Sequence, residues 1–409
     1  MGKSVLLGSA SSNGAIVNDA ITTRYPATGV FNNDSTDTYA AQAVRFAGTM
    51  SNLFAYVHAN TTGVTSVLTM VQNYANSSIT VSYAAAETGI KEDTSNTESF
   101  AATDECNIKF AVPSDAGTTA VTISLSAMQF EPTSASDTLT CTCQRSDSTF
   151  STDSVTRYGA ISGTEGAVTT EANVNHRVRA SFTASNLYVG LSTNARTTDI
   201  VYKTRKNNAD GAQSVTYTSG QTGIKEDTSN SDSLSSGDDF NTAFVTSTGG
   251  GSFTREQVSL NLLNTSNQFD FATSIVNGSS TSFNVTTYYT VGSQLSPSTT
   301  EATKSFYPRF DFTAKELVSY VSANTIATSA SVFTLRDNGS DSSVTVSYAA
   351  AETGLKNDST NTASVTSATD EICIKLATPN TSGSITTRSL HILGETASAS
   401  TFTPQVMMM

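Results

Sequence analysis

One short phrase occurs three times in the 409-residue chain, and this repetition limits the possible folds more than any other feature. It reads AAAETGIKEDTSN at 84–96, TSGQTGIKEDTSN at 218–230 and AAAETGLKNDSTN at 349–361. The copies are about 130 residues apart, which is the length of a whole domain rather than of a solenoid repeat. The sequence therefore predicts three related domains in tandem.

Matching residues extend the repeat well beyond this phrase. SNLFAYVHANT at 51–61 corresponds to SNLYVGLSTNA at 185–195 and to KELVSYVSANT at 315–325. Four residue types keep their place in every copy: Tyr83, Tyr217 and Tyr348; Gly89, Gly223 and Gly354; Asn60, Asn194 and Asn324; and Arg45, Arg179 and Arg309. Such long matched segments predict that the three modules superpose.

The three modules, with limits 1–132, 133–265 and 266–409, are predicted to be all-β. Short runs alternate between apolar and polar residues, as in ITVSYA at 79–84 and VTVSYA at 344–349, and no long stripe has a helical period. Charged residues are only 14% of the chain, and the serine, threonine and asparagine in their place suit strand faces and turns better than helices. About eight short strands per module, with turn residues between them, predict three tandem jelly-roll-like β-sandwiches.

The segments that begin the second and third modules also resemble strands. LTCTCQRSDSTF at 139–150 and FDFATSIVN at 269–277 carry apolar residues, and no flexible Pro/Gly/Ser spacer separates the modules. Because exposed apolar strand edges invite aggregation, we expect both segments to be buried against neighbouring modules. Two arrangements stay open: one pseudo-threefold unit, or a rod. We also expect a homo-oligomer, with a trimer preferred to a dimer.

The charge balance argues against two classes of partner. The formal net charge is −13, whereas nucleic acids and anionic membranes bind basic surfaces. No run approaches the roughly 20 apolar residues that span a bilayer, and the N-terminal apolar run VLLG is too short for a secretory signal. We therefore expect a soluble protein that is released without such a signal.

The repeated phrase is rich in functional side chains, and two interpretations compete. In the first, Gly89 supplies the backbone freedom for a turn between strands, and Asp93 and Asn96 accept hydrogen bonds from nearby backbone amides. In the second, its carboxylate and amide oxygens bind Ca²⁺ or another ligand.

Two substitutions between the copies favour the turn. Gln221 in the second copy stands where the first has Glu87, and Asn357 in the third stands where the first has Glu92. A site that depends on charge would keep its carboxylates. Lys91 lies four residues after Glu87, but this spacing implies a pair only in a helix.

The residues with catalytic or metal-binding chemistry form no recognisable motif. His58, His176 and His391 lie at different places in their modules, and one histidine per module is too few for a histidine-rich zinc site. TGGGS at 248–252 is interpreted as a hairpin loop, and DNGSD at 337–341 as a turn that lacks the later glutamate of an EF-hand. We predict no catalytic residue, no cofactor and no metal.

The four cysteines give no sign of a site either. Cys141 and Cys143 form a C-x-C pair on a predicted strand, and Cys106 and Cys373 stand alone. This pattern is neither a zinc motif nor a disulfide framework. It predicts buried free thiols.

The repeated arginines have two possible roles. Arg45, Arg179 and Arg309 each precede an apolar strand. The expected role is to hold a loop carbonyl or carboxylate within the same module. A contact between modules or between subunits is the alternative.

Several phrases resemble a β-sandwich module of tailed-bacteriophage virion-surface proteins. They are AGTMSNL at 47–53, SNLYV at 185–189, TRKNNAD at 204–210, TGIKEDTSN at 222–230 and SSGDDF at 235–240. The resemblance covers most of all three modules and implies a place on the virion surface without enzyme activity. The first copy lacks the RKN element and the third lacks the GD after its turn. These departures count against a ligand-binding role for the two elements, but they do not affect the expected fold.

The function expected from these observations is a non-enzymatic structural role in a virus particle. The chain would be a bacteriophage capsid decoration or head-fibre protein on the capsid exterior, with the major capsid protein or tail proteins as partners. A tail-associated or receptor-binding protein and a bacterial surface adhesin or filament subunit are the alternatives. A carbohydrate-active enzyme is disfavoured, because the chain has no Trp and few aromatic residues to stack on sugars.

Overall fold

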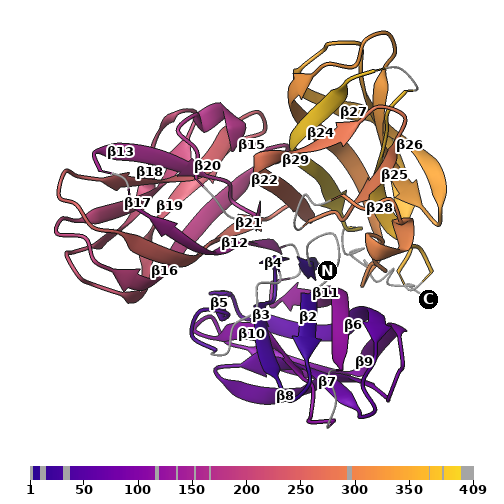
Figure 1. Ribbon diagram of the computed structural model, residues 1–409, viewed down its shortest axis with the longest axis horizontal. Helices are drawn as coiled ribbons and strands as arrows, with labels where there is room; N and C mark the ends of the chain where they lie inside the picture. Colours follow the sequence, from indigo (N-terminus) through magenta and orange to yellow (C-terminus); the bar gives the residue numbers. More distant parts are fainter. Residues whose placement is uncertain are drawn as a thin grey trace, which may run out of the picture.

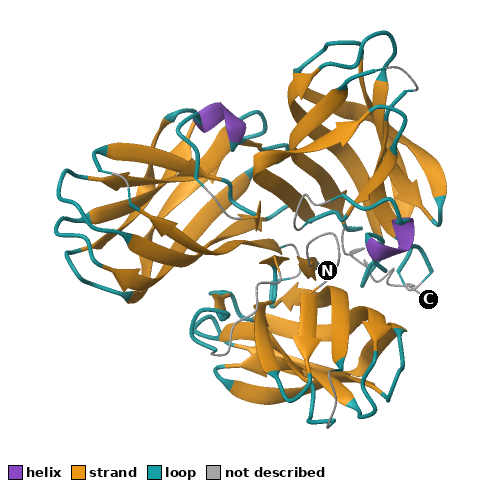
Figure 2. Cartoon of the chain, in the orientation of Figure 1, coloured by secondary structure: helices purple, strands orange, loops and turns teal. Residues whose placement is uncertain are grey.

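The computed structural model describes residues 3–9, 15–30, 37–115, 119–134, 137–151, 153–164, 167–292, 297–367, 369–379 and 382–397. Within these ranges the secondary structure consists of β-strands and two short 3-10 helices (Figure 2). The strands form three β-sandwiches that lie around a common centre, as in a triangle (Figure 1). The prediction of an all-β chain of three tandem jelly-roll-like sandwiches is confirmed.

The first module contains strands β1 to β11. Their bounds are β1 (Ser4–Ser9), β2 (Ala15–Asn18), β3 (Thr22–Pro26), β4 (Gly29–Val30), β5 (Gln42–Ala43), β6 (Gly48–Asn60), β7 (Ser66–Gln72), β8 (Ala75–Tyr83), β9 (Gly89–Phe100), β10 (Glu105–Ala111) and β11 (Ala120–Pro132). The two sheets have the strand orders β1-β11-β6-β9 and β3-β10-β7-β8. Because each sheet mixes strands from both ends of the module, this is the arrangement of a double-sheet jelly roll.

The second module repeats this arrangement. Its elements are β12 (Thr138–Phe150), β13 (Val155–Gly159), β14 (Gly163–Thr164), η1 (Glu171–Asn173), β15 (His176–Arg177), β16 (Phe182–Asn194), β17 (Ile200–Lys206), β18 (Ala209–Tyr217), β19 (Gly223–Leu234), β20 (Asp239–Thr246) and β21 (Phe253–Asn264). The strand orders are β12-β21-β16-β19 and β13-β20-β17-β18.

The third module has the same two sheets. Its elements are β22 (Gln268–Ser282), β23 (Thr286–Tyr289), η2 (Glu301–Thr303), β24 (Phe312–Asn324), β25 (Ser331–Asp337), β26 (Ser340–Tyr348), β27 (Gly354–Val365), β28 (Ile372–Ala377) and β29 (Ser384–Glu395). The orders are β22-β29-β24-β27 and β23-β28-β25-β26. The predicted module limits fall in the connections β11–β12 and β21–β22.

The repeated tyrosine has the same role in each module. Its side chain is fully buried, and its hydroxyl donates a hydrogen bond to a backbone carbonyl of a strand in the facing sheet. The bonds run from Tyr83 to Ala55 at 2.7 Å, from Tyr217 to Val189 at 2.6 Å and from Tyr348 to Ser319 at 2.7 Å. The three tyrosines are therefore structurally equivalent, as the repeat predicts.

The repeated phrase is a turn followed by a strand. Gly89, at φ +98°, begins β9. Asp93 is buried and accepts hydrogen bonds from the backbone amides of Thr80 at 2.9 Å and Asn96 at 3.0 Å. The sequence predicts that the side chain of Asn96 accepts a backbone hydrogen bond. In the structure this side chain instead donates to the Asp93 carboxylate. The same network surrounds the aspartates of the other copies, Asp227 and Asp358.

The first long strands of the modules meet at the centre of the triangle. β12 contacts both β1 and β22. The short strand β14 pairs in parallel with β12 and with β22, so the second and third modules share a nine-stranded sheet. The predicted burial of 139–150 and 269–277 against neighbouring modules is confirmed for Leu139 and Cys141, which join the core of the first module, and for Ala272, which joins that of the second. Thr149 is exposed, and Phe269 and Phe271 lie in the core of their own module.

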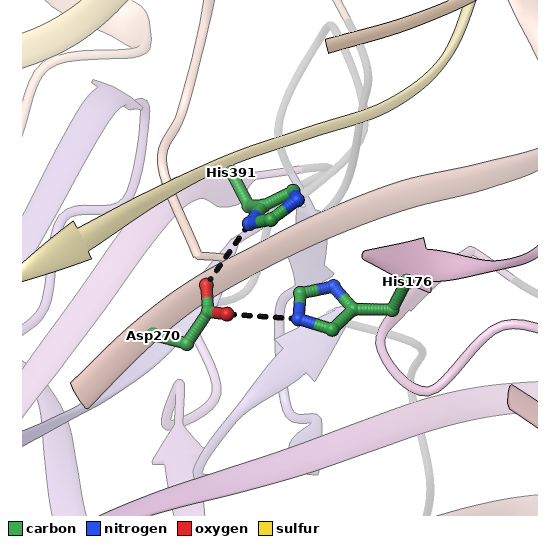
Figure 3. Close-up of side chains that lie close together, drawn as sticks. All are labelled: His176, Asp270 and His391. Atoms are coloured by element: carbon green, nitrogen blue, oxygen red, sulfur yellow. Dashed lines mark hydrogen bonds and ion pairs between the residues drawn. The ribbon is translucent and has the colours of Figure 1, made fainter. Parts of the chain in front are cut away.

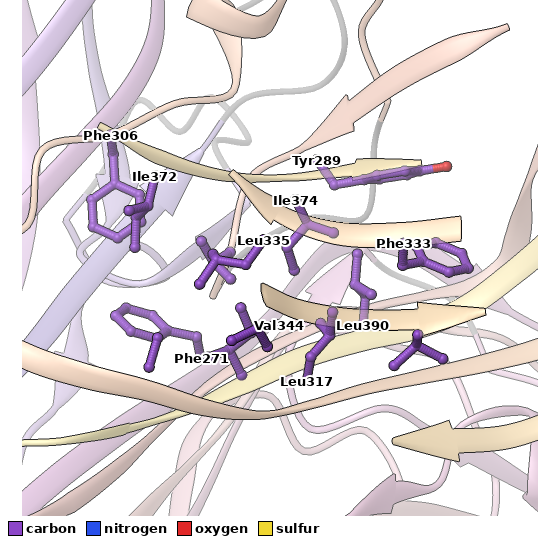
Figure 4. Close-up of a cluster of buried hydrophobic side chains, with 14 of the residues drawn as sticks. Phe271, Tyr289, Phe306, Leu317, Phe333, Leu335, Val344, Ile372, Ile374 and Leu390 are labelled. Atoms are coloured by element: carbon purple, nitrogen blue, oxygen red, sulfur yellow. The ribbon is translucent and has the colours of Figure 1, made fainter. Parts of the chain in front are cut away.

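Each hydrophobic core includes side chains from the next module. The second module contributes Leu139 and Cys141 to the core of the first, and the third contributes Ala272 and Leu393 to the core of the second. The first module contributes Phe54, Leu125 and Ala127 to the core of the third. Figure 4 shows the third core. Because the exchange runs from first to second, second to third and third to first, the chain closes into a pseudo-threefold ring rather than a rod.

The two glycine-containing segments are ordinary loops. TGGGS at 248–252 lies between β20 and β21, and DNGSD at 337–341 forms the hairpin between β25 and β26. Both interpretations from the sequence are confirmed.

Candidate functional site: the interfaces between modules

In the described part of the chain, three arginine–glutamate ion pairs connect the modules, and each uses one of the repeated arginines. The shortest distance is 2.8 Å in every pair, from Arg45 to Glu226, from Arg179 to Glu316 and from Arg309 to Glu92. The pairs join the first module to the second, the second to the third and the third to the first. They therefore follow the same cyclic order as the shared cores.

The expected role of these arginines within their own modules is only part of what they do. Arg45 Nη1 donates to the carbonyl of Thr103 at 2.7 Å, and Arg309 Nε donates to that of Tyr307 at 2.9 Å. The carboxylate partner, however, belongs to the next module in all three cases. The alternative of a contact between modules is thus correct, and sequence reasoning missed it because the partners are 137 to 217 residues away in the sequence.

The third copy obtains its carboxylate from a different strand. Glu92 and Glu226 occupy the same position in the repeated phrase, and Asn357 replaces them in the third module. The neighbouring strand supplies Glu316 instead, and Asn357 Nδ2 donates to its carboxylate at 3.4 Å. The loss of the carboxylate at 357 counts against a ligand site in the repeated phrase, but the position still has a role in charge pairing between modules.

The three pairs differ in environment. Only 3% of the Arg309 side chain is exposed, against 19% for Arg45 and 17% for Arg179. The Arg309 guanidinium also lies over the ring of Phe54, 5.1 Å from its centroid. A buried charge that lost its partner would be costly, so the Arg309 pair should matter most to stability.

A buried polar cluster lies between the second and third modules. His176 on β15, Asp270 on β22 and His391 on β29 point toward one another (Figure 3). His176 Nε2 lies 2.8 Å from Asp270 Oδ2, and His391 Nδ1 lies 3.4 Å from Asp270 Oδ1. The two imidazole rings are 4.3 Å apart between centroids.

The protonation of this cluster follows from its surroundings. Burial alone would raise the pKa of Asp270, but the two imidazoles outweigh it and hold the pKa below its ordinary value. Burial lowers the pKa of His391, and the carboxylate of Asp270 opposes that effect only in part. The cluster therefore contains a carboxylate and a neutral His391 at neutral pH.

This cluster corrects one argument made from the sequence. The sequence argument considers each module alone and finds one histidine in each, too few for a metal site. In the structure two of the three histidines meet across an interface between modules. They do so because they occupy different positions of the repeat and belong to adjacent modules. No spacing rule within one module could have found them.

The corresponding positions at the other interfaces carry different residues. By strand pairing, Gln42 corresponds to His176, and Cys141 corresponds to Asp270. Ser259 corresponds to His391, and Asn261, two residues further along β21, donates to the carbonyls of Ala43 at 3.3 Å and Val44 at 2.7 Å. The first interface is thus joined by amide hydrogen bonds where the second has the histidine–aspartate cluster.

The cysteines are buried and free, as predicted. Burial raises the pKa of the Cys141 and Cys373 thiols to about 12 and raises that of Cys106. Such thiols are unreactive at neutral pH, because the thiolate is the nucleophile.

Two open grooves occur on the described surface. One of about 500 Å³ lies beside the Arg45–Glu226 pair and is also lined by Phe46 and Ser185. The other, of about 300 Å³, lies at the end of the third module near Glu395. Among the described residues, no helix is long and apolar enough to cross a membrane.

The solved structures similar to this chain include a bacterial lyase and a viral protein. No family model matches the chain, and no curated protein matches it. A Paenibacillus xanthan lyase is 14% identical with a TM-score of 0.18, and the match covers 72% of this chain but only 30% of the lyase. A triple-jelly-roll protein of an archaeal virus turret is 10% identical with a TM-score of 0.18, covering 95% of this chain and 91% of that one. At these TM-scores neither likeness carries an argument about function.

Proposed function

We propose that the chain is a non-enzymatic structural protein of a virus particle, a bacteriophage capsid decoration or head-fibre protein on the capsid exterior. The observation that supports the proposal most is the closed ring of three Arg–Glu pairs between similar modules. It gives one chain the shape and contacts of a trimer. Such a unit suits a threefold or quasi-threefold position of an icosahedral shell.

The chemistry of the surface is consistent with this role. A net charge of −13 and many Ser, Thr and Asn residues favour solubility at the high local concentration of a particle surface. The expected partners are the major capsid protein or tail proteins, with no role for nucleic acid or membrane. The resemblance of the repeated phrases to phage surface modules supports the same assignment.

The rigidity of the ring adds a physical reason. Side chains of one module complete the core of another, so the modules cannot move freely relative to one another. A decoration protein must keep one shape while it is seated on a shell. Enzymes with mobile lids need the opposite property.

Purified particles of a phage that encodes the chain give the direct test. A decoration protein should co-purify with capsids in a fixed ratio to the shell protein, and antibody-gold should label heads. Scarce copies at the tail together with binding to host cells would favour the receptor-binding alternative. Presence on uninfected bacteria would favour an adhesin, and glycan release by the pure chain would refute a non-enzymatic role.

A further inference from the structure

We propose that His176, Asp270 and His391 bind one divalent transition-metal ion of the zinc type, which joins the second and third modules. The inference rests on the buried cluster alone and does not depend on the virion proposal. The ligand atoms of the three side chains all lie within 4.8 Å of one another. Two imidazole nitrogens and a carboxylate oxygen are a common zinc ligand set.

The spacing of the ligand atoms supports a shared ion. Two atoms bound to one tetrahedral zinc at about 2.0–2.1 Å lie about 3.3 Å apart. The separation between His391 Nδ1 and Asp270 Oδ1 is 3.4 Å, and that between His176 Nε2 and Asp270 Oδ2 is 2.8 Å. One pair already has the required separation, and the other must widen by about 0.5 Å. The two pairs use different oxygens of Asp270, so the carboxylate must bind through both oxygens or turn slightly to bring both nitrogens to one ion.

The hydrogen bonding of the cluster is incomplete without a further group. His391 is 1% exposed, and neither of its ring nitrogens has a hydrogen-bond partner among the described residues. Asp270 Oδ1 is buried and lacks a hydrogen-bond partner in the same part of the chain. Leaving buried polar atoms unpaired costs free energy, and an ion between Nδ1 and Oδ1 would satisfy both atoms.

The fold itself does not require charged residues at these positions. The first interface has Gln42, Cys141 and Ser259 there. It closes with amide hydrogen bonds from the flanking Gln257 and Asn261 and with apolar packing. A histidine–aspartate–histidine set at one interface of three is therefore an added feature. It must offset the cost of burying a carboxylate.

The immediate surroundings leave room for one more ligand. A cavity of about 10 Å³ adjoins His176 and is lined by Asn175, Thr273 and Ser389, which places it at the lower limit for one water. Arg179 lies close enough to lower the pKa of His391. It is paired with Glu316, so it adds little net positive charge near the proposed ion. The ion would link β15 of the second module to β22 and β29 of the third.

Metal analysis of the full chain tests the proposal with matched variants. His176→Gln and His391→Ser introduce the residues that the first interface has at these positions, so both should fold. The third histidine supplies the control, because His58 lies outside the cluster and bonds Ser124 at 2.7 Å. Protein is to be made in zinc-supplemented cells, and in parallel refolded with Zn²⁺ after chelation.

The expected result is about one zinc per chain in the wild type and in His58→Gln, with at least a 10-fold lower occupancy in the two cluster variants. Zinc should also raise the midpoint of thermal unfolding of the wild type by a few degrees and leave those of the cluster variants unchanged. Wild-type chain without stoichiometric zinc by either route, or cluster variants that keep it, would overturn the proposal.

X-ray absorption at the zinc edge keeps the test decisive if the variants fail to fold. The wild-type spectrum should show nitrogen and oxygen neighbours at about 2.0–2.1 Å with imidazole scattering. A sulfur shell at about 2.3 Å would assign the metal to the cysteines and refute the site.

Discussion

Glu316 holds an uncommon backbone conformation, and its interface explains why. Its φ is +54°, in the left-handed region that asparagine tolerates better than glutamate. The other copies have Asn52 and Asn186 at this position, also with positive φ. Glutamate is retained in the third copy because its carboxylate is the partner of Arg179. A local backbone cost is thus offset by a contact between modules.

Returning the carboxylate to its position in the other copies tests this explanation. Glu316→Asn should relax the backbone but remove the partner of Arg179, for a net loss of about 1 kcal/mol in the free energy of unfolding. Adding Asn357→Glu should recover at least that amount, because the new carboxylate corresponds to Glu226. Urea unfolding measures both changes. A double variant no more stable than Glu316→Asn would contradict the explanation.

The three arginines should differ in their contribution to stability. Arg309→Ala removes a buried guanidinium from Glu92 and from the face of Phe54, so we expect a loss of about 3 kcal/mol. Arg45→Ala breaks a more exposed pair and should cost about 1 kcal/mol. Chemical denaturation compares them, with Lys91→Ala, outside the ring, as the control. Equal losses for the two arginines would show that burial does not determine how much each ion pair contributes to stability.

The aspartate turn, a bulge in the middle of β9, β19 and β27, recurs in all three modules. Asp93, Asp227 and Asp358 each accept backbone bonds from the preceding strand and from the following turn. Burial opposes the charge of Asp358, but hydrogen bonds from Thr345, Asn361 and neighbouring amides lower its pKa from 3.8 to about 2. The turn therefore stabilises the module only while the aspartate is ionised.

The pH dependence of this turn can be measured at Asp358. Because its pKa is lower in the folded chain, the stabilisation is complete above about pH 4 and is lost as the pH falls toward 2. Asp358→Asn should cost about 2 kcal/mol at pH 7, and its difference from wild type should shrink toward zero near pH 2. Ser359→Ala, exposed in the same turn, should match wild type throughout. A difference that does not change with pH would refute the assignment.

The elements within a module could be predicted, whereas the contacts between modules could not. The strands, the glycine turn and the role of Asp93 follow from periodicity and turn chemistry, which act over a few residues. The partner of Arg45 and the meeting of His176 with His391 depend on how modules pack. Those contacts join distant positions that no local pattern relates. The role of Asn96 was wrong in detail because its amide can donate as well as accept.

At the scale of the whole molecule, shared cores should make unfolding cooperative. Phe54 and Leu125 of the first module belong to the core of the third, so loss of one module exposes apolar surface in another. We expect one calorimetric transition whose van't Hoff and calorimetric enthalpies agree. Arg309→Ala should lower its midpoint without splitting it. Three resolved transitions would show that the modules fold independently.

Self-association of the chain stays a prediction. A trimer would give a mass-photometry peak near three times 42.8 kDa, the mass of one chain. The ring already uses the faces between modules, so the trimer must use their outer surfaces. A single peak at the mass of one chain at micromolar concentration would contradict self-association and leave docking on a shell.

The unequal interfaces have a consequence for imaging. A nearly threefold chain bound at an exactly threefold position of a capsid can take three orientations, related by rotation about the axis, that make similar contacts. A reconstruction that imposes the axis would then superpose the modules and keep sharp only what they share, such as Tyr83 with Tyr217 and Tyr348. The density of His176 and His391 would be diluted among three positions. Only classification of the particle images without imposed symmetry would distinguish the three modules from one another.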